Sequence, residues 1–203
     1  MGCSADFRAL KRRLSVLRAR FLPRKFSQMG AYSAKQLDRA RAYCLLAHAE
    51  IEHYLEKRAR EIVVSAMRKW RESRYVSHTL VHLACNINGN RVGLPTKLGC
   101  PESVTSILQE AVNQYFHSLD TNHGIRIENI LRILLPIGVR ESDLDPVWLS
   151  TIDAFGGRRG RAAHSSAVTY TIDPQDELNT VKSIMDGLRE LDQLLNRMLR
   201  QLG

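Results

Sequence analysis

Apolar residues recur at steps of three and four along most of the chain, which is the spacing of an amphipathic α-helix. The first such pattern covers residues 7–21 and ends before Pro23, with Lys and Arg between its apolar positions. The second begins at a capping box formed by Ser33 and Gln36 and continues to about Trp70 without Pro or Gly. Such a length favours one long helix that also lines an interface.

Shorter helical patterns, separated by turn residues, make up the remainder. We expect a helix over residues 75–85, a helical hairpin over 102–119 and 127–135, a helix from Asp145–Pro146 that stops at Gly156–Gly157, a short helix from about Arg159, and a last helix opened by Asp173–Pro174. The only strand-like stretch is VTYTI. The fold predicted is therefore one all-α, single-domain bundle, in which residues 1–30 supply a basic N-terminal helix that packs on the helical domain of residues 31–203.

Composition limits the class of protein. The chain has 203 residues, of which 44% are hydrophobic and 25% charged, a balance that permits a packed core. No run of eighteen or more apolar residues occurs, so we expect no membrane contact and a cytoplasmic location. The four cysteines form no CxxC pair and fit reduced thiols.

Positive charge is concentrated in the first third of the chain. The formal net charge is +9, and residues 1–74 carry 18 Lys and Arg against 7 Asp and Glu. Because 23 of the 30 basic residues are Arg, whose planar guanidinium matches phosphate, a polyanion such as RNA is the natural partner. The candidate RNA contacts are Arg12, Arg13, Arg18 and Arg20. The alternative is that these arginines only make a helix surface soluble.

Most catalytic signatures are absent, including the phosphate-binding loop and HExxH. His78, His82 and Cys85 have a spacing that could face one zinc ion, but without a second matched pair they fit ordinary helix residues better, and we predict neither a metal nor a cofactor. The segment FGGRRGRAAHSSA is more informative. Two glycines free its backbone, and a helix start there would offer N–H donors and a positive dipole end to a phosphate, beside Arg158, Arg159, Arg161 and His164. An Arg-rich solvated turn is the alternative.

The stretch RGRAAH resembles the R-x4-6-H motif of the HEPN superfamily, with Arg159 as its arginine and His164 as its histidine. Arg158 with His164 would also satisfy the spacing of the motif. The stretch ARAYCLLAHAEIEHYLE is similar to the long helix of the RiboL-PSP type of HEPN domain, whose H-A-x-x-E pattern falls on His48, Ala49 and Glu52. NHGIRIENILRILLPIGV resembles the helix that precedes the motif in that group. One departure is Gly160, which stands where these sequences usually have a polar residue such as Asn.

The resemblance implies a metal-independent endoribonuclease of a prokaryotic defence or toxin system, acting as a homodimer whose two motifs share one cleft. His164 would exchange the proton and Arg159 would stabilise the phosphorane, while Arg158 and Arg161 would hold flanking phosphates and Glu52 would orient Arg159. An antitoxin or sensor protein is a possible further partner. The alternative, raised by Gly160, is a HEPN-like module that binds RNA or a protein without cleavage.

Overall fold

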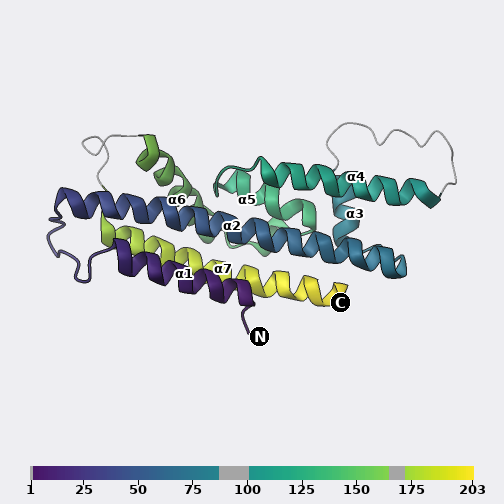
Figure 1. Cartoon of the computed structure of the whole chain (residues 1–203), viewed down its shortest axis with the longest axis horizontal. Coiled ribbons are helices and arrows are strands. Elements are labelled where there is room, and N and C mark those ends of the chain that lie inside the picture. Colours follow the sequence, from purple (N-terminus) through teal and green to yellow (C-terminus); the bar gives the residue numbers. More distant parts are fainter. Residues whose placement is uncertain (1, 87–100, 165–171) are drawn as a thin grey trace. The chain divides into compact units, whose positions relative to one another are not determined.

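The computed structural model describes residues 2–86, 101–164 and 172–203, except for the side chains of 101–103 and 161–164 (Figure 1). Over these ranges the chain is helical and contains no strand, which confirms the all-α prediction. The strand-like stretch 168–172 lies outside the described residues, except for Ile172.

Nine helical segments occur in the described ranges. They are α1 (Ala5–Phe21), α2 (Ala34–Ser73), α3 (His78–Cys85), α4 (Pro101–Asp120), α5 (Ile127–Leu134), the 3-10 turns η1 (Leu135–Ile137) and η2 (Glu141–Asp143), α6 (Pro146–His164) and α7 (Pro174–Leu202). None of these helices has the length and hydropathy that a membrane crossing needs.

The chain divides into two compact units. Unit 1 comprises Met1–Leu55, Gly124–Glu128 and Leu144–Leu194, and unit 2 comprises Glu56–His123, Asn129–Asp143 and Leu195–Gly203. Unit 1 holds the Arg-x4-His motif and is described first. A single domain stays a prediction.

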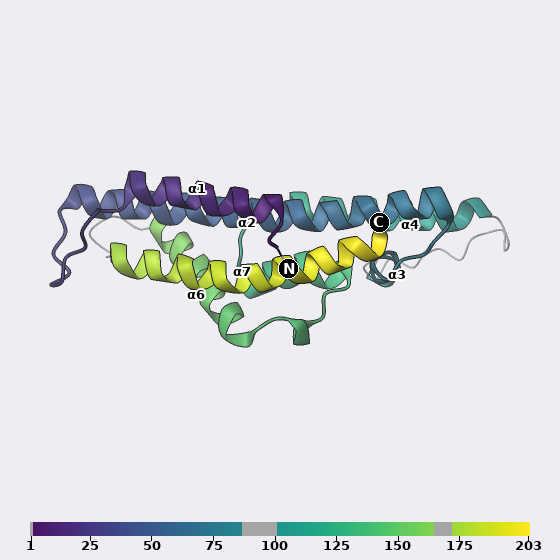
Figure 2. The same cartoon turned by 90° about the horizontal axis from the view of Figure 1, so that it is seen from below.

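In unit 1, α1 is fixed to α2 and α7 through its apolar stripe and its capped start. The Ser4 side chain caps the helix by accepting from the Phe7 N–H, and the Ser4 N–H donates to Oδ2 of buried Asp192 at 2.7 Å. Oδ1 of Asp192 accepts from the Tyr54 hydroxyl at 2.9 Å. Figures 1 and 2 both show α1 running beside α7. The face of α1 opposite the stripe is left to its basic side chains.

The start of α2 is the predicted capping box. The Ser33 N–H donates to the Gln36 side chain at 2.9 Å, and the Gln36 N–H donates to the Ser33 hydroxyl at 3.3 Å. From this start the helix continues for 40 residues. The prediction of one long helix is therefore confirmed.

The prediction that Gly156 and Gly157 end a helix is wrong. Both glycines lie inside α6, which continues to His164. A Cβ on Gly156 would lie 3.4 Å from the Arg126 backbone nitrogen and 3.5 Å from the Ile125 carbonyl carbon. Because Gly156 has no side chain, the turn before α5 can pack closely against α6. This packing explains why a residue of low helix propensity is accommodated in the interior of α6.

At the start of α7, Asp173 acts as the predicted cap, because its side chain accepts from the Gln175 and Asp176 N–H groups. Further along, a Cβ on Gly187 would overlap the Trp148 ring. The indole of Trp148 fills this position and donates to the Ile184 carbonyl at 3.1 Å. This contact joins α6 to α7, and a side chain larger than that of glycine at position 187 would prevent it.

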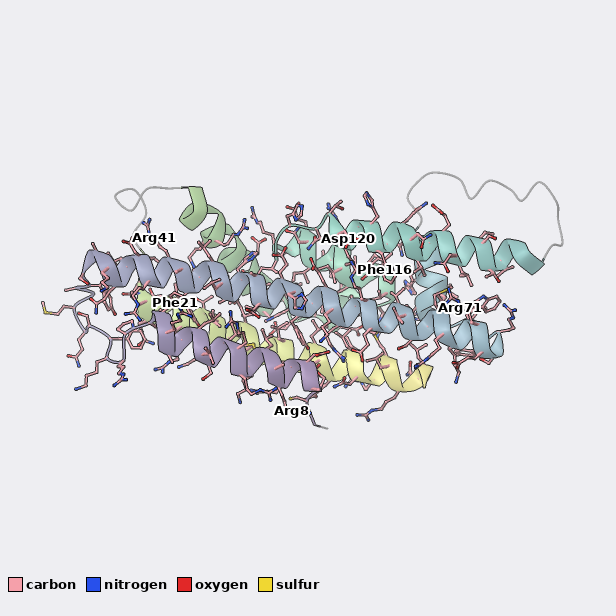
Figure 3. All side chains as sticks on the ribbon, viewed as in Figure 1. Arg8, Phe21, Arg41, Arg71, Phe116 and Asp120 are labelled. Atoms are coloured by element: carbon pink, nitrogen blue, oxygen red, sulfur yellow. The ribbon has the colours of Figure 1, made fainter. Side chains whose placement is uncertain are left out.

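Unit 2 is built on α3, α4 and the parts of α2, α5 and α7 that belong to it. Arg60 of α2 is paired with Asp120 of α4 and lies 4.9 Å from the ring centroid of Phe116. Asp120 and Phe116 are labelled in Figure 3. The Tyr115 hydroxyl, also on α4, donates to the Ile133 carbonyl at 2.7 Å. These contacts connect α4 with α2 and α5.

Candidate functional site

The Arg-x4-His motif lies in the last turns of α6, so the prediction that it lies at a helix start is wrong. The expected free N–H donors and positive dipole end are therefore not available to it, and the arginines stand near the negative end of the helix dipole instead. Arg159 is exposed. His164 is the last helical residue, and its side chain and that of Arg161 lie outside the described residues.

Arg158 is held by α7. Its Nε donates to Oε1 of Glu177 at 2.7 Å, and its Nη2 donates to the Thr180 hydroxyl at 2.9 Å. The guanidinium also lies 5.8 Å from the ring centroid of Phe155, one turn earlier on α6. Glu177 is 2% exposed, so Arg158 neutralises a carboxylate that would otherwise be buried as a lone charge.

Cys44 of α2 completes this buried group. Burial, followed by the charge of Glu177, raises the pKa of its thiol well above the usual value. Burial also raises the pKa of Glu177, although Arg158 and Cys44 both act in the opposite direction. A thiol in this environment stays protonated and is an unreactive packing group rather than a nucleophile.

His48 lies one turn further along α2 and is 2% exposed. Its ring centroid is 6.2 Å from that of Phe155. Burial, followed by the charge of Arg159, lowers the pKa of His48 to about 4. The imidazole is therefore neutral at neutral pH.

Glu52 is bound to the turn before α5. Its Oε1 accepts from the Gly124 N–H, and its Oε2 lies 3.6 Å from Nδ1 of His48. A carboxylate at this distance favours a charged imidazole, but burial and Arg159 outweigh it in the pKa of His48. The role of Glu52 in orienting Arg159 stays a prediction.

A continuous α6 separates the two motif residues around the helix. Because each residue turns by about 100°, positions 159 and 164 point about 140° apart. Position 158 is six residues from 164 and diverges by about 120°. The backbone of one chain therefore does not aim either arginine position at the same point as position 164.

The four predicted RNA contacts on α1 are all exposed, but their surroundings differ. Arg13 is paired with Glu50 of α2, with 2.7 Å between Nε and Oε1. Arg20 lies 5.6 Å from the ring centroid of Phe21. Arg12 and Arg18 have no ion-pair partner in the part of the chain that the structure describes. Among the four, Arg13 is the one whose charge is offset by a carboxylate of the described residues.

His78 and His82 lie together on α3, with 3.1 Å between their Nε2 atoms. The ring of His78 packs against Gly138, where a Cβ would lie 2.9 Å from Nδ1. Across the described ranges, no three His, Cys, Asp or Glu residues are grouped as metal ligands. The pair lies in unit 2, whereas the motif belongs to unit 1.

The helical architecture and the Arg-x4-His motif together indicate the protein family. An all-α domain with an Arg-x4-His segment is typical of HEPN domains, and the RiboL-PSP-HEPN family model matches residues 25–197. The chain belongs to the RiboL-PSP-HEPN family, as its sequence features indicated. No curated protein and no solved structure matches it. HEPN domains include ribonucleases and RNA-binding modules.

Sequence patterns missed Glu177 and Cys44. Glu177 follows the predicted cap Asp173 by four residues, where an acidic residue is expected to face solvent and the helix dipole. Cys44 had no partner pattern at all. Their proximity depends on tertiary packing between residues 133 positions apart, for which one sequence holds no local signal.

Proposed function

We propose that this protein is a metal-independent endoribonuclease that acts as a homodimer in a prokaryotic defence or toxin system. The observation that carries the proposal is the difference between two adjacent arginines. Arg158 is engaged by Glu177 and Thr180, whereas Arg159 is exposed and has no ion-pair partner among the described residues. Arg159 is thus the arginine free to meet a phosphate, with His164 as the other member of the motif.

In the proposed reaction, His164 removes the proton from an RNA 2′-hydroxyl, and the 2′-oxygen attacks the adjacent phosphorus. Arg159 stabilises the extra negative charge of the phosphorane. The bond to the 5′-oxygen then breaks, and this oxygen leaves with a proton. The products are a 2′,3′-cyclic phosphate and a 5′-hydroxyl end. A histidine with an ordinary pKa near ~6.5 can exchange both protons at neutral pH.

The dimer supplies the convergence that one helix lacks. Since positions 159 and 164 diverge by about 140° on α6, a second motif across a twofold axis would bring an arginine and a histidine to one phosphate. The same divergence supports the alternative function, a module that binds RNA or a protein without cleaving. The two proposals differ in whether the RNA 2′-hydroxyl reacts: cleavage requires it as the nucleophile, and binding alone does not.

The test uses matched RNAs with and without a single 2′-deoxy nucleotide at the cut site, incubated in EDTA. We expect cleavage of only the unmodified RNA, with cyclic phosphate ends detected by mass spectrometry. Arg159→Ala and His164→Ala should each lower turnover by at least ~10² with an unchanged circular dichroism spectrum. Binding of both RNAs without cleavage would favour the non-catalytic module.

Mixed dimers test the shared cleft. Wild-type chains combined with Arg159→Ala, His164→Ala double-variant chains should lose more activity than the fraction of chains replaced, because every shared cleft needs both copies. A loss in simple proportion would mean that each chain holds a complete site.

A further inference from the structure

A pocket of about 420 Å³ lies in unit 1 between α1 and α7, with Tyr43 of α2 in its lining. Its apolar lining includes Leu14 of α1 and Val181 and Met185 of α7. The volume falls within the roughly 300–1,000 Å³ of small-molecule sites. None of these lining residues belongs to the Arg-x4-His motif.

Cationic side chains border this apolar lining on both helices. Lys11 and Arg18 are seven residues apart on α1, and Lys182 and Arg189 are seven apart on α7. Seven residues make nearly two helical turns. The two side chains of each pair therefore point in almost the same direction, from positions about 10 Å apart along the helix axis. Two cationic rows therefore flank one apolar depression.

Most of this charge is uncompensated. Asp186, which also lines the pocket, pairs with Arg189 at 3.3 Å. Lys11, Arg18 and Lys182 have no carboxylate within ion-pair distance among the described residues. The lining therefore has an excess of three positive charges beside apolar side chains, and the complementary ligand has an anionic group joined to an apolar body.

We propose that this pocket binds a small amphipathic anion, with its alkyl or aryl body against Leu14, Val181 and Met185 and its carboxylate or phosphate between the cations. This inference goes beyond RNA cleavage and does not depend on it. A protein partner would need about 800 Å² of contact, far more than this pocket offers.

Calorimetric titration of the full chain tests the two halves of the ligand separately. The probes are decyl phosphate and decanoate below their micelle concentrations, with decanol and inorganic phosphate as the matched single-feature controls. We expect at least one of the two anions to bind tenfold or more tightly than either control, and the better anion identifies the headgroup. Equal binding of decanol, or of inorganic phosphate alone, would overturn the proposal.

Variants locate the binding site. Lys182→Glu and Ser15→Trp should each weaken binding of the better anion at least tenfold, since the first reverses a pocket charge and the second fills the opening from an exposed lining position. The control is Lys35→Glu, which makes the same substitution as Lys182→Glu at an exposed α2 position outside the lining. Binding in Lys35→Glu should stay within twofold of wild type.

Two results contradict the pocket as the site. If Lys35→Glu weakens binding as much as Lys182→Glu, the ligand is held by the general positive charge of the protein. If a ten-nucleotide RNA displaces the anion and its own affinity falls with Ser15→Trp, the occupant is nucleic acid. Circular dichroism of each variant distinguishes a lost site from a lost fold.

Discussion

Two neighbouring arginines in α6 have different surroundings, and the difference comes from one buried carboxylate. Glu177 is 2% exposed and accepts from Arg158, whereas Arg159 stays exposed beside it. The sequence RRGR does not distinguish these positions. Only the packing of α7 against α6 identifies which guanidinium is bound by Glu177 and which one is exposed.

Arg158→Ala should lower the free energy of unfolding by about 3 kcal/mol at pH 7, because it leaves the Glu177 carboxylate buried without its cation. The loss should diminish as the pH falls, since Glu177, whose pKa is already raised by burial, can then be protonated. Urea denaturation at pH 7 and pH 5 measures both effects. Arg159→Ala is the control and should change stability little; equal losses would mean that the two arginines are equivalent.

His48 gives stability a pH dependence of predictable sign. Its folded-state pKa of about 4 lies below the usual 6.5, so the unfolded chain binds the proton first and stability is lost as the pH falls from 6.5 through 4. The loss should be on the order of 3 kcal/mol. Urea denaturation of wild type and His48→Leu over this range isolates the effect, because only wild type carries it.

His53→Leu is the matched control on α2, since His53 is exposed. Its pH profile should be parallel to that of wild type. If His48→Leu were also parallel to wild type, the imidazole at position 48 would be charged or accessible in the folded state.

At the scale of whole elements, helix starts were predictable because their signals are local. Ser33 with Gln36 caps α2, and Asp173 caps α7, as the short-range patterns indicated. The end of α6 was not predictable. In the sequence, Gly156 and Gly157 indicate the end of a helix. The residues that Gly156 packs against, Ile125 and Arg126, are about 30 positions earlier in the chain, so no local pattern shows why glycine is needed there.

Substitution of the two glycines by alanine should therefore have opposite consequences. Gly157 has open space at its Cβ position, so Gly157→Ala should stabilise the protein by about 0.5–1 kcal/mol through helix propensity. Gly156→Ala makes the same gain but forces a Cβ to 3.0 Å from Cγ of Arg126, and a net loss of about 1 kcal/mol is expected. Thermal unfolding compares the two, and equal stabilisation would contradict the close packing.

At the scale of the whole molecule, the sequence predicted where positive charge is concentrated, but it did not predict which charged side chains form ion pairs. The excess of Lys and Arg in residues 1–74 places basic side chains on α1, where Arg12 and Arg18 remain unpaired among the described residues. Arg13, by contrast, is paired with Glu50. No pattern in a single sequence predicts that pairing, because it depends on how α1 lies on α2.

The salt dependence of RNA affinity should reflect this difference. Replacing Arg12 by Ala should lower the slope of log K against log salt by about 0.7, the value for one phosphate contact to a single strand. Arg13→Ala should change the slope less, since Glu50 already offsets its charge. Fluorescence anisotropy of a labelled RNA between 50 and 200 mM salt measures both, and an unchanged slope in Arg12→Ala would assign that arginine to solubility.

The indole of Trp148, seated over Gly187, has a spectroscopic consequence. The chain has two tryptophans, and Trp148 belongs to unit 1 while Trp70 belongs to unit 2. Trp148 donates to the Ile184 carbonyl, whereas the Trp70 ring lies 5.5 Å from the Arg74 guanidinium carbon. Each unit thus carries one intrinsic fluorophore in its own surroundings. In single-tryptophan variants, the fluorescence emission therefore reports the unfolding of one unit at a time. Coincident unfolding curves of the two variants would indicate one cooperative domain.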